Sequence, residues 1–306
     1  YTLLGVVALL AALLRNSEVA QLVGLCDHKV NPEDLFPFAP FIESVSKVDT
    51  VEARLLTAEK FFTQYVQLSR PLLIKNGINN WGASTKWTND YLVSKLGNET
   101  VKVELSKDNI FRYTNLDFTN YMSFTDFIKI MEKANTTNHE NYYITGIPNI
   151  EPLYPDLKEI PFAKLLTRYQ VGFWMGSGGQ VTPVHIDECE NIMAVFSGKK
   201  KFILFDPTQS KYMYPLHINN LYASAVDLSN PDLSKFPKYA KALPHKLEVK
   251  VEAGDLLYVP AFWWHEVHSE GRNIGVNFFY NAHSLLLHSF YAGIKDKIPN
   301  SADQYV

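Results

Sequence analysis

The chain has few cysteines and no excess of positive charge. Its 306 residues include only Cys26 and Cys189, which excludes a scaffold held by several disulfides and a zinc module built from cysteine pairs. The formal net charge is −3, so the chain lacks the excess of basic residues that usually accompanies nucleic-acid binding. A local basic patch could survive this average, so the charge disfavours a nucleic-acid substrate without ruling one out.

The chain also lacks an apolar run long enough to cross a membrane comfortably. The most apolar run, from Thr2 to Leu14, is shorter than the roughly 20 residues that a transmembrane helix needs. Its length fits the hydrophobic region of a signal peptide, so residues 1–20 predict targeting to the secretory pathway or endoplasmic reticulum, or a membrane anchor. The alternative is a short buried helix, and with it a location in the cytoplasm or nucleus.

No internal repeat or low-complexity tract divides the chain. With 46% hydrophobic and 20% charged residues, the composition is that of a globular protein with one substantial core. Residues 21–56 contain several prolines and predict a linker with short helices. Residues 57–141 predict a mixed, mainly helical support, residues 142–281 a β core, and residues 282–306 a C-terminal helix or tail.

Short strands separated by glycine and proline turns dominate the second half. Residues 191–205 predict two strands joined at Gly198. Residues 247–251 and 256–259 predict two more around a Gly-Asp turn, and residues 274–280 a closing strand. These patterns predict a mainly β fold with flanking helices, a double-stranded β-helix or jelly roll of the cupin-like type.

A histidine and an aspartate two residues apart, His185 and Asp187, indicate a metal site. Side chains alternate along a strand, so the two would project from one face and could bind one ion. His265 lies far downstream, and a barrel would bring it opposite this pair. Two imidazoles and one carboxylate form the facial triad that binds non-haem Fe(II) and leaves positions open for O₂ and a co-substrate. Zn(II) or Mn(II) could occupy the same ligands.

Four segments surround these ligands in a fixed order: His185-Ile186-Asp187, Gly254 to Pro260, Trp263-Trp264-His265 and Asn277 to Tyr280. They resemble the JmjC family of Fe(II)- and 2-oxoglutarate-dependent oxygenases, in its small hydroxylase-like branch. The resemblance implies an enzyme that uses Fe(II), 2-oxoglutarate and O₂, with ascorbate as a reductant. It assigns the metal, and with it the catalytic centre, to His185, Asp187 and His265.

The same resemblance implies a subsite for the far carboxylate of 2-oxoglutarate. It assigns Lys200 as the cation, Thr182 and Tyr143 as hydroxyl partners, and Asn191 and Asn277 as polar neighbours nearer the iron. Such a cation and its donors would offset the desolvation of a buried dianion.

Neighbouring residues remain alternatives for these roles. Lys200 shares its strand parity with Phe202, which favours it over the two lysines beside it. Tyr142 competes with Tyr143 for the hydroxyl role. Thr182 could instead end a turn before the proline that follows it.

The activity we predict is hydroxylation of a protein or peptide side chain, with succinate and CO₂ as co-products. Demethylation of N-methyl-lysine and hydroxylation of a tRNA nucleoside are alternatives within the same chemistry. A metal-binding cupin module without turnover is the alternative of a different class, although such a module has no need of a buried lysine.

Two further regions carry expectations about partners. Residues 207–246 predict an insertion at the barrel mouth, and the candidate substrate contacts in it are Tyr212, Tyr214, His217, Tyr222 and Asp227. Apolar residues in the C-terminal segment, 282–306, are candidates for a homodimer interface.

Overall fold

The computed structural model describes most of the chain, namely residues 45–106, 119–134, 141–145, 150–218 and 221–281. The expectations for the apolar N-terminal run and for the C-terminal segment therefore concern residues outside the described ranges, as does Cys26. Across these ranges, no helix has the length and apolar character needed to cross a membrane.

Strands form most of the described structure. They are β1 (Asp49–Glu52), β2 (Leu72–Lys75), β3 (Thr100–Ser106), β4 (Thr119–Ser123), β5 (Asn141–Ile144), β6 (Arg168–Gly176), β7 (Val181–Ile186), β8 (Glu190–Phe205), β9 (Pro215–Ile218), β10 (Leu221–Ser224), β11 (Leu247–Glu252), β12 (Leu256–Val259) and β13 (Trp264–Tyr280).

The helices are short. The α-helices are α3 (Ala58–Phe61), α4 (Ala83–Lys86), α5 (Asn89–Leu96) and α6 (Phe124–Ala134), and a π-helical turn, η4 (Phe62–Val66), continues α3. The 3₁₀ turns are η3 (Ala53–Leu55), η6 (Glu151–Asp156), η7 (Pro161–Ala163), η8 (Pro207–Tyr212), η9 (Pro237–Lys241) and η10 (Leu243–His245).

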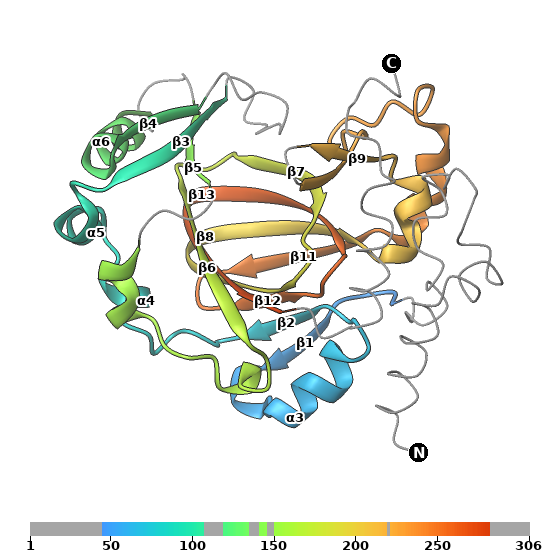
Figure 1. Ribbon diagram of the computed structural model, residues 1–306, viewed down its shortest axis with the longest axis horizontal. Helices are drawn as coiled ribbons and strands as arrows, with labels where there is room; N and C mark the ends of the chain where they lie inside the picture. Colours follow the sequence, from blue (N-terminus) through green and yellow to red (C-terminus); the bar gives the residue numbers. More distant parts are fainter. Residues whose placement is uncertain (1–44, 107–118, 135–140, 146–149, 219–220, 282–306) are drawn as a thin grey trace, which may run out of the picture.

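Two long strands, β8 and β13, belong to both faces of the barrel. They pair with each other from one end to the other, and each changes its second partner halfway. The first half of β8 pairs with β12 and its second half with β11, while β13 pairs first with β7 and then with β6. One face therefore runs from β1 to β4 through the order β1-β2-β12-β8-β13-β6-β5-β3-β4, and the other contains β11, β7, β10 and β9 (Figure 1). This arrangement confirms the predicted double-stranded β-helix.

Both long strands are longer than the sequence-based expectation. Residues 191–205 form one continuous strand, which bends at Gly198 with a φ of +71°. A Cβ there would lie 2.6 Å from the carbonyl oxygen of Arg272, so glycine is required. β13 starts at Trp264, ten residues before the predicted strand. Its first half has no apolar alternation, because polar site residues face the interior and the insertion covers the other face.

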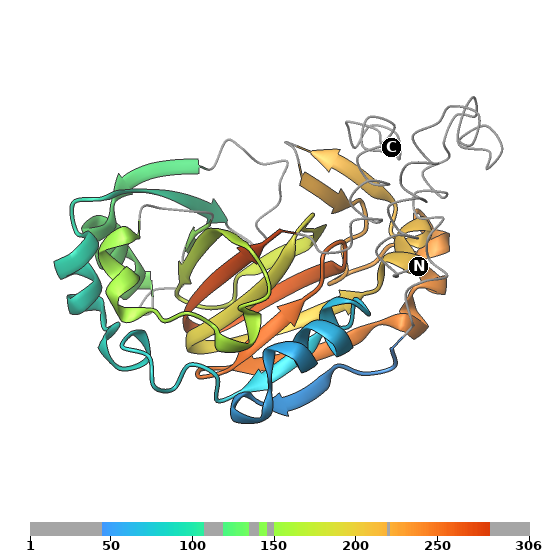
Figure 2. The same ribbon diagram turned by 60° about the horizontal axis from the view of Figure 1, so that its bottom comes forward.

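The helical support begins where its capping residues predict. The Thr57 hydroxyl accepts a hydrogen bond from the backbone N–H of Lys60 at the start of α3, and the Ser123 hydroxyl accepts one from Asp126 at the start of α6. β1 was not predicted, since its residues fall in the region that we expected to be a linker. It pairs in parallel with β2 at the edge of the sheet (Figure 2).

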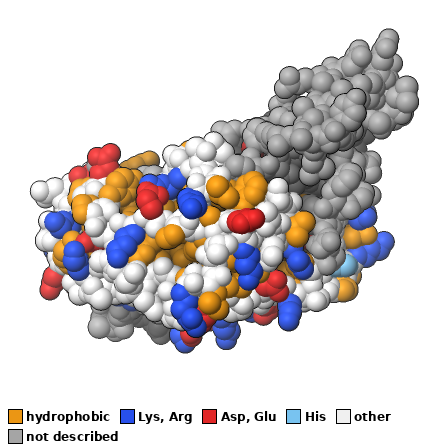
Figure 3. All heavy atoms as spheres, turned by 90° about the horizontal axis from the view of Figure 1, so that it is seen from below, with side chains coloured by type: hydrophobic (Ala, Val, Ile, Leu, Met, Phe, Trp, Pro, Cys, Tyr) orange, Lys and Arg blue, Asp and Glu red, His pale blue; other side chains and the backbone are white. Residues whose placement is uncertain are grey.

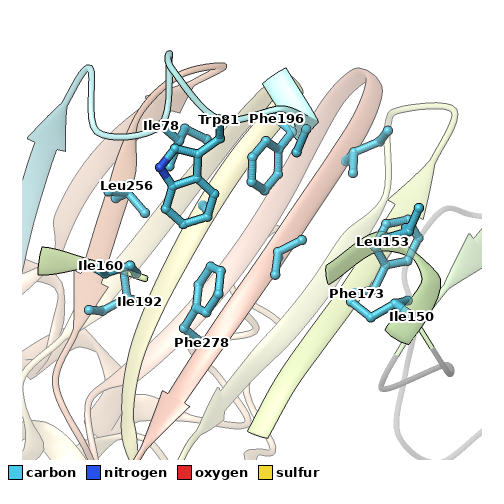
Figure 4. Packing of buried hydrophobic residues seen from close by; sticks show 14 of the residues in the cluster. Ile78, Trp81, Ile150, Leu153, Ile160, Phe173, Ile192, Phe196, Leu256 and Phe278 are labelled. Carbon is cyan, nitrogen blue, oxygen red and sulfur yellow. The ribbon is translucent and has the colours of Figure 1, made fainter. Parts of the chain in front are cut away.

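One hydrophobic core joins the support to the barrel. Trp81 packs its indole edge-on against Phe278 of β13, with ring centroids 5.8 Å apart, and also contacts Phe196 of β8 (Figure 4). Residues of α3, α5 and α6 belong to the same buried cluster as these strands. The support thus covers the outer side of the large sheet. A separate buried cluster of barrel residues, which includes Met193, Phe202 and Val267, lies among the polar residues described below.

The insertion at 207–246 has a small core of its own. Tyr222, Phe236 and Tyr239 pack there against Phe205 and Trp264 of the barrel. Tyr222 is 1% exposed, and its ring holds the insertion on the barrel, so a substrate contact through this residue stays a prediction. The side chain of His217 lies outside the described residues.

Candidate active site

The structure brings His185, Asp187 and His265 together at one end of the barrel. Their ligand atoms all lie within 4.8 Å of one another. His185 is near the end of β7, Asp187 follows that strand directly, and His265 is the second residue of β13. We expected His265 to lie opposite the pair, but β7 and β13 are neighbours, and His265 is the direct strand partner of His185. Their ring centroids are 4.1 Å apart.

Both imidazoles are oriented by backbone carbonyl groups. Nδ1 of His185 lies 2.9 Å from the carbonyl oxygen of Pro183, and Nδ1 of His265 lies 3.0 Å from that of Trp263. A proton on each Nδ1 satisfies these contacts, which assigns the lone pair to Nε2. The two Nε2 atoms then face Asp187, at 4.0 Å and 3.5 Å from its carboxylate oxygens. The rings are thus set to bind a cation between them.

The charge states of the triad also suit a metal. Burial, together with the neighbouring His265, lowers the pKa of His185 to about 4, so its imidazole is neutral at physiological pH. Burial would raise the pKa of Asp187, but contacts with His265, His185 and Asn191 outweigh it and bring the value to about 2. A neutral imidazole at His185 and a carboxylate at Asp187 are the protonation states that a metal ion requires of these two residues.

An amide pair extends from Asp187 into the barrel. Nδ2 of Asn191 donates to the Asp187 carboxylate at 2.9 Å, and Nδ2 of Asn277 donates to the Asn191 carbonyl oxygen at 2.6 Å. Asn191 is the second residue of β8 and Asn277 lies on β13, so the pair also joins these two strands. Asn191 thus contacts the triad directly, and Asn277 contacts it through Asn191.

Lys200 is buried deeper in the same barrel, with 1% of its surface exposed. Its ammonium donates hydrogen bonds to the Ser269 hydroxyl at 2.8 Å, and to the Tyr143 hydroxyl and the Asn273 carbonyl oxygen at 3.3 Å each. Thr182 also hydrogen-bonds the Tyr143 hydroxyl. The acceptors are all neutral, so among the described residues no carboxylate compensates the lysine charge. Burial lowers the pKa of Lys200 to about 7.

The lysines on either side of Lys200 point outward. Lys199 forms an ion pair with Glu252 at 3.2 Å, and Lys201 forms one with Glu248 at 2.8 Å. Gly275, on the neighbouring strand, leaves space for the aliphatic part of Lys200, because a Cβ there would lie 2.9 Å from the lysine Cε. Side-chain alternation along β8 and the small size of Gly275 therefore place Lys200, and not Lys199 or Lys201, inside the barrel.

Two buried polar atoms of barrel residues have no hydrogen-bond partner within the part of the chain that the structure describes. They are the indole N–H of Trp174 and the carbonyl oxygen of Asn277. Both flank Gly172, where an added Cβ would lie 3.4 Å from the indole nitrogen and 3.6 Å from Asn277. Buried donors and acceptors normally have partners. An elongated anion that extends from the triad toward Lys200, such as 2-oxoglutarate, has oxygens that could accept from the Trp174 indole and from Lys200. The Asn277 oxygen needs a donor, which this dianion does not have.

Ser269 and Asn273 are site residues that sequence reasoning missed. Both lie on β13 and point to the same side as His265 and Asn277, at intervals of four residues. A strand predicted from Trp264 onward would have placed Ser269 and Asn273 on the inner face, because every second residue faces the same side. They were missed because the predicted strand began at residue 274.

The other residues near the triad have structural roles. Trp263 donates its indole N–H to the backbone carbonyl of Ser69, and Trp264 donates to the Ser210 hydroxyl, so both hold the segment that carries His265. His268 contacts the Glu266 carboxylate at 2.7 Å. Burial raises the pKa of the Cys189 thiol, which keeps it protonated.

The comparisons with known proteins agree with this geometry. Residues 58–285 match the family model described as "Cupin-like domain". The chain is 28% identical to the human tRNA wybutosine-synthesizing protein 5 over 72% of this chain and 74% of that protein. It is 30% identical to the lysine-specific demethylase JMJ30 of Arabidopsis thaliana over 74% of this chain and 53% of that protein.

A third relative is the human bifunctional peptidase and (3S)-lysyl hydroxylase JMJD7, 27% identical over 76% of this chain and 83% of that protein. The family match covers most of the chain and includes the two histidines, the aspartate and the buried lysine. This chain therefore belongs to the cupin-like, JmjC-type family of Fe(II)- and 2-oxoglutarate-dependent oxygenases.

Proposed function

We propose that the protein hydroxylates a side chain of a protein or peptide, with succinate and CO₂ as co-products. The observation that carries this proposal is the presence of an intact His-Asp-His group and a buried, uncompensated lysine in one barrel. His185, Asp187 and His265 would hold Fe(II), and Lys200 would bind the far carboxylate of 2-oxoglutarate. When bound, iron and 2-oxoglutarate supply the oxidising chemistry that inserts one atom of O₂ into a substrate C–H bond.

The protein contributes binding, orientation and exclusion of water. The backbone contacts at Pro183 and Trp263 fix the two imidazoles. The Asn191–Asn277 pair orients the Asp187 carboxylate. Tyr143 and Thr182 are hydroxyl partners at the lysine end.

The rim near Asp187 suits a side chain with an alkyl stem and a positive charge. Tyr169 is 53% exposed and lies against Phe279, with ring centroids 6.5 Å apart. The negative charges of Asp187 and Glu188 act on its hydroxyl, which places both carboxylates near this ring. Aromatic rings and carboxylates favour cationic groups. This supports a basic protein side chain, in line with the lysine named for two of the relatives.

The face shown in Figure 3 gives less support to a tRNA substrate, although one relative is a tRNA-modifying protein. The face shown in Figure 3 carries lysine, arginine and acidic side chains interspersed with one another. A substrate held through its phosphates would favour a continuous basic patch.

The test is coupled turnover of 2-oxoglutarate. The full chain with Fe(II) and ascorbate is offered lysine- and arginine-containing peptides, methyl-lysine peptides and tRNA, and succinate and product masses are measured. We expect a peptide that gains one oxygen atom in step with succinate. His185→Ala should abolish both signals, whereas His245→Ala, which removes an exposed histidine, should leave them unchanged.

Other outcomes would replace the proposal. Release of formaldehyde from a methyl-lysine peptide would make the protein a demethylase, and oxygen gained only by tRNA would make it a nucleoside hydroxylase. If the wild type neither turns over nor binds 2-oxoglutarate, the barrel is a metal-binding module without this activity.

A further inference from the structure

The Lys200 ammonium lies in a cage of neutral groups contributed mostly by β13. Ser269 and Asn273 accept hydrogen bonds from it at 2.8 Å and 3.3 Å, and Tyr143 accepts a third at 3.3 Å. An ammonium group has three N–H bonds, so a bound carboxylate would take one of them from a contact at 3.3 Å, and the acceptors that remain would hold the direction of the group. None of these acceptors is charged, and the positive charge stays available for a ligand.

The Asn273 amide has one orientation because of its own donors. Its Nδ2 donates to the side-chain oxygen of Gln180 at 3.1 Å and to the carbonyl oxygen of Gly176 at 3.3 Å. The Gln180 oxygen also accepts from the backbone N–H of Gly178 at 2.9 Å, so it cannot be the amide nitrogen. Asn273 must therefore present its oxygen to Lys200. Both amide side chains are fully buried, with 0% exposed.

The backbone that carries Asn273 is held on two sides. A Cβ on Gly178 would lie 2.7 Å from the backbone nitrogen of Gly271, and one on Gly198 would lie 2.6 Å from the carbonyl oxygen of Arg272. These contacts leave the segment little room to move. Arg272 braces it from outside through hydrogen bonds to Asn89, Ser197 and the backbone of Trp87, at the wall of a surface hollow of about 500 Å³.

We propose that Asn273, oriented by Gln180, is a positioning residue that aims the Lys200 ammonium at the far carboxylate of 2-oxoglutarate while leaving its charge uncompensated. The inference rests on the proposed use of Lys200 as the anchor of this co-substrate. An amide suits the role because it accepts a hydrogen bond without a charge. A carboxylate of the same shape would pair with the lysine and repel the ligand.

The experiment compares Asn273→Asp and Asn273→Ala with the wild type as full chains loaded with Mn(II), which stands in for iron without redox chemistry. Isothermal titration gives the Kd for 2-oxoglutarate, a separate titration gives the Kd for Mn(II), and thermal unfolding gives Tm. Asn230→Asp is the matched control, because it adds the same charge at an exposed position.

We expect Asn273→Asp to weaken 2-oxoglutarate binding by at least about tenfold, and more than Asn273→Ala does, with Mn(II) affinity unchanged. In turnover, KM for 2-oxoglutarate should rise while kcat at saturation stays within about twofold. Wild-type affinity in both variants would overturn the inference. So would an equal loss of Mn(II) and 2-oxoglutarate binding that follows Tm, since that marks general disruption. If the wild type binds no 2-oxoglutarate, the proposed function itself fails.

Discussion

For Lys200, the sequence predicted the direction of the side chain but only some of its partners. Its parity with Phe202 predicted that it faces inward, and the structure buries it while its two lysine neighbours form surface ion pairs. Its partners were only half predicted. Tyr143 was expected from the resemblance, whereas Ser269 and Asn273 depend on the pairing of β13 with β8, which local patterns do not encode.

The lowered pKa of Lys200 predicts a pH dependence for co-substrate binding. Burial brings this pKa to about 7, and the lysine is charged below that value. Because the ligand is an anion, its affinity should fall as the pH rises through about 7, by about tenfold for each further unit, until the pKa of the liganded state is passed. Isothermal titration with 2-oxoglutarate and Mn(II), from about pH 6 to about pH 9, measures this.

Lys200→Met is the control for this prediction. This variant should bind 2-oxoglutarate weakly at every pH, because methionine keeps the apolar stem of lysine and has no charge. Its affinity should therefore not fall as the pH rises through neutrality. A wild-type affinity that stays constant across neutral pH would show that the lysine remains fully protonated.

At the scale of elements, the position of His265 depends on the turn between β12 and β13. The buried Glu190 carboxylate accepts hydrogen bonds from the Tyr258 hydroxyl at 2.6 Å and from the backbone N–H of Ala261 at 3.1 Å. Trp263 and Trp264 hold the same turn through their indole N–H groups. The sequence did not predict the role of Glu190, which lies in a different strand.

Tyr258→Phe should therefore destabilise the fold by about 1–3 kcal/mol, because a buried carboxylate loses one of its donors. Urea unfolding followed by tryptophan fluorescence gives this free energy. Tyr154→Phe is the comparison, since Tyr154 is 45% exposed, and its effect should stay within about 0.5 kcal/mol. Equal stabilities of the two variants would mean that the Glu190 contact contributes little.

At the scale of the molecule, Asp156 connects several short helices of the support to one another and, through Trp87, to the barrel. This buried carboxylate accepts hydrogen bonds from Lys86 at 2.7 Å, from the Trp87 indole at 3.1 Å and from the Tyr91 hydroxyl at 2.6 Å. Trp87 in turn packs on Phe196 of β8, with ring centroids 4.8 Å apart. One side chain thus links η6, α4 and α5 to the large sheet.

Asp156→Asn should destabilise the whole fold by about 1–3 kcal/mol, whereas Asp227→Asn, at an exposed turn, should not. Burial would raise the pKa of Asp156, but its hydrogen bonds to Lys86, Tyr91 and Trp87 lower it below the ordinary value. Its stabilising effect is then present above the unfolded pKa of about 4 and is lost as the pH falls further. Urea unfolding near pH 7 and near pH 3 should show a smaller difference between Asp156→Asn and wild type at the lower pH.

Metal binding should also stabilise the molecule as a whole, because the triad exists only when β7 and β13 are paired. At a metal concentration about 100 times Kd, the free energy of unfolding should rise by about 2.7 kcal/mol, and chelation should remove the gain. Thermal unfolding with Mn(II) or with a chelator measures the shift in Tm. His185→Ala should lose it and His245→Ala should keep it; a shift retained in His185→Ala would place the metal elsewhere.

The sequence by itself determined the mainly β fold, the identity and spacing of His185 and Asp187, and the inward parity of Lys200. These properties depend on residues close together in the chain, where alternation and turn chemistry act directly. The tertiary structure decided that His265 pairs directly with His185 and that Ser269 and Asn273 surround Lys200. It also decided that Tyr222 belongs to the core of the insertion. These contacts depend on register between strands far apart in sequence, which is set by the packing of the whole barrel.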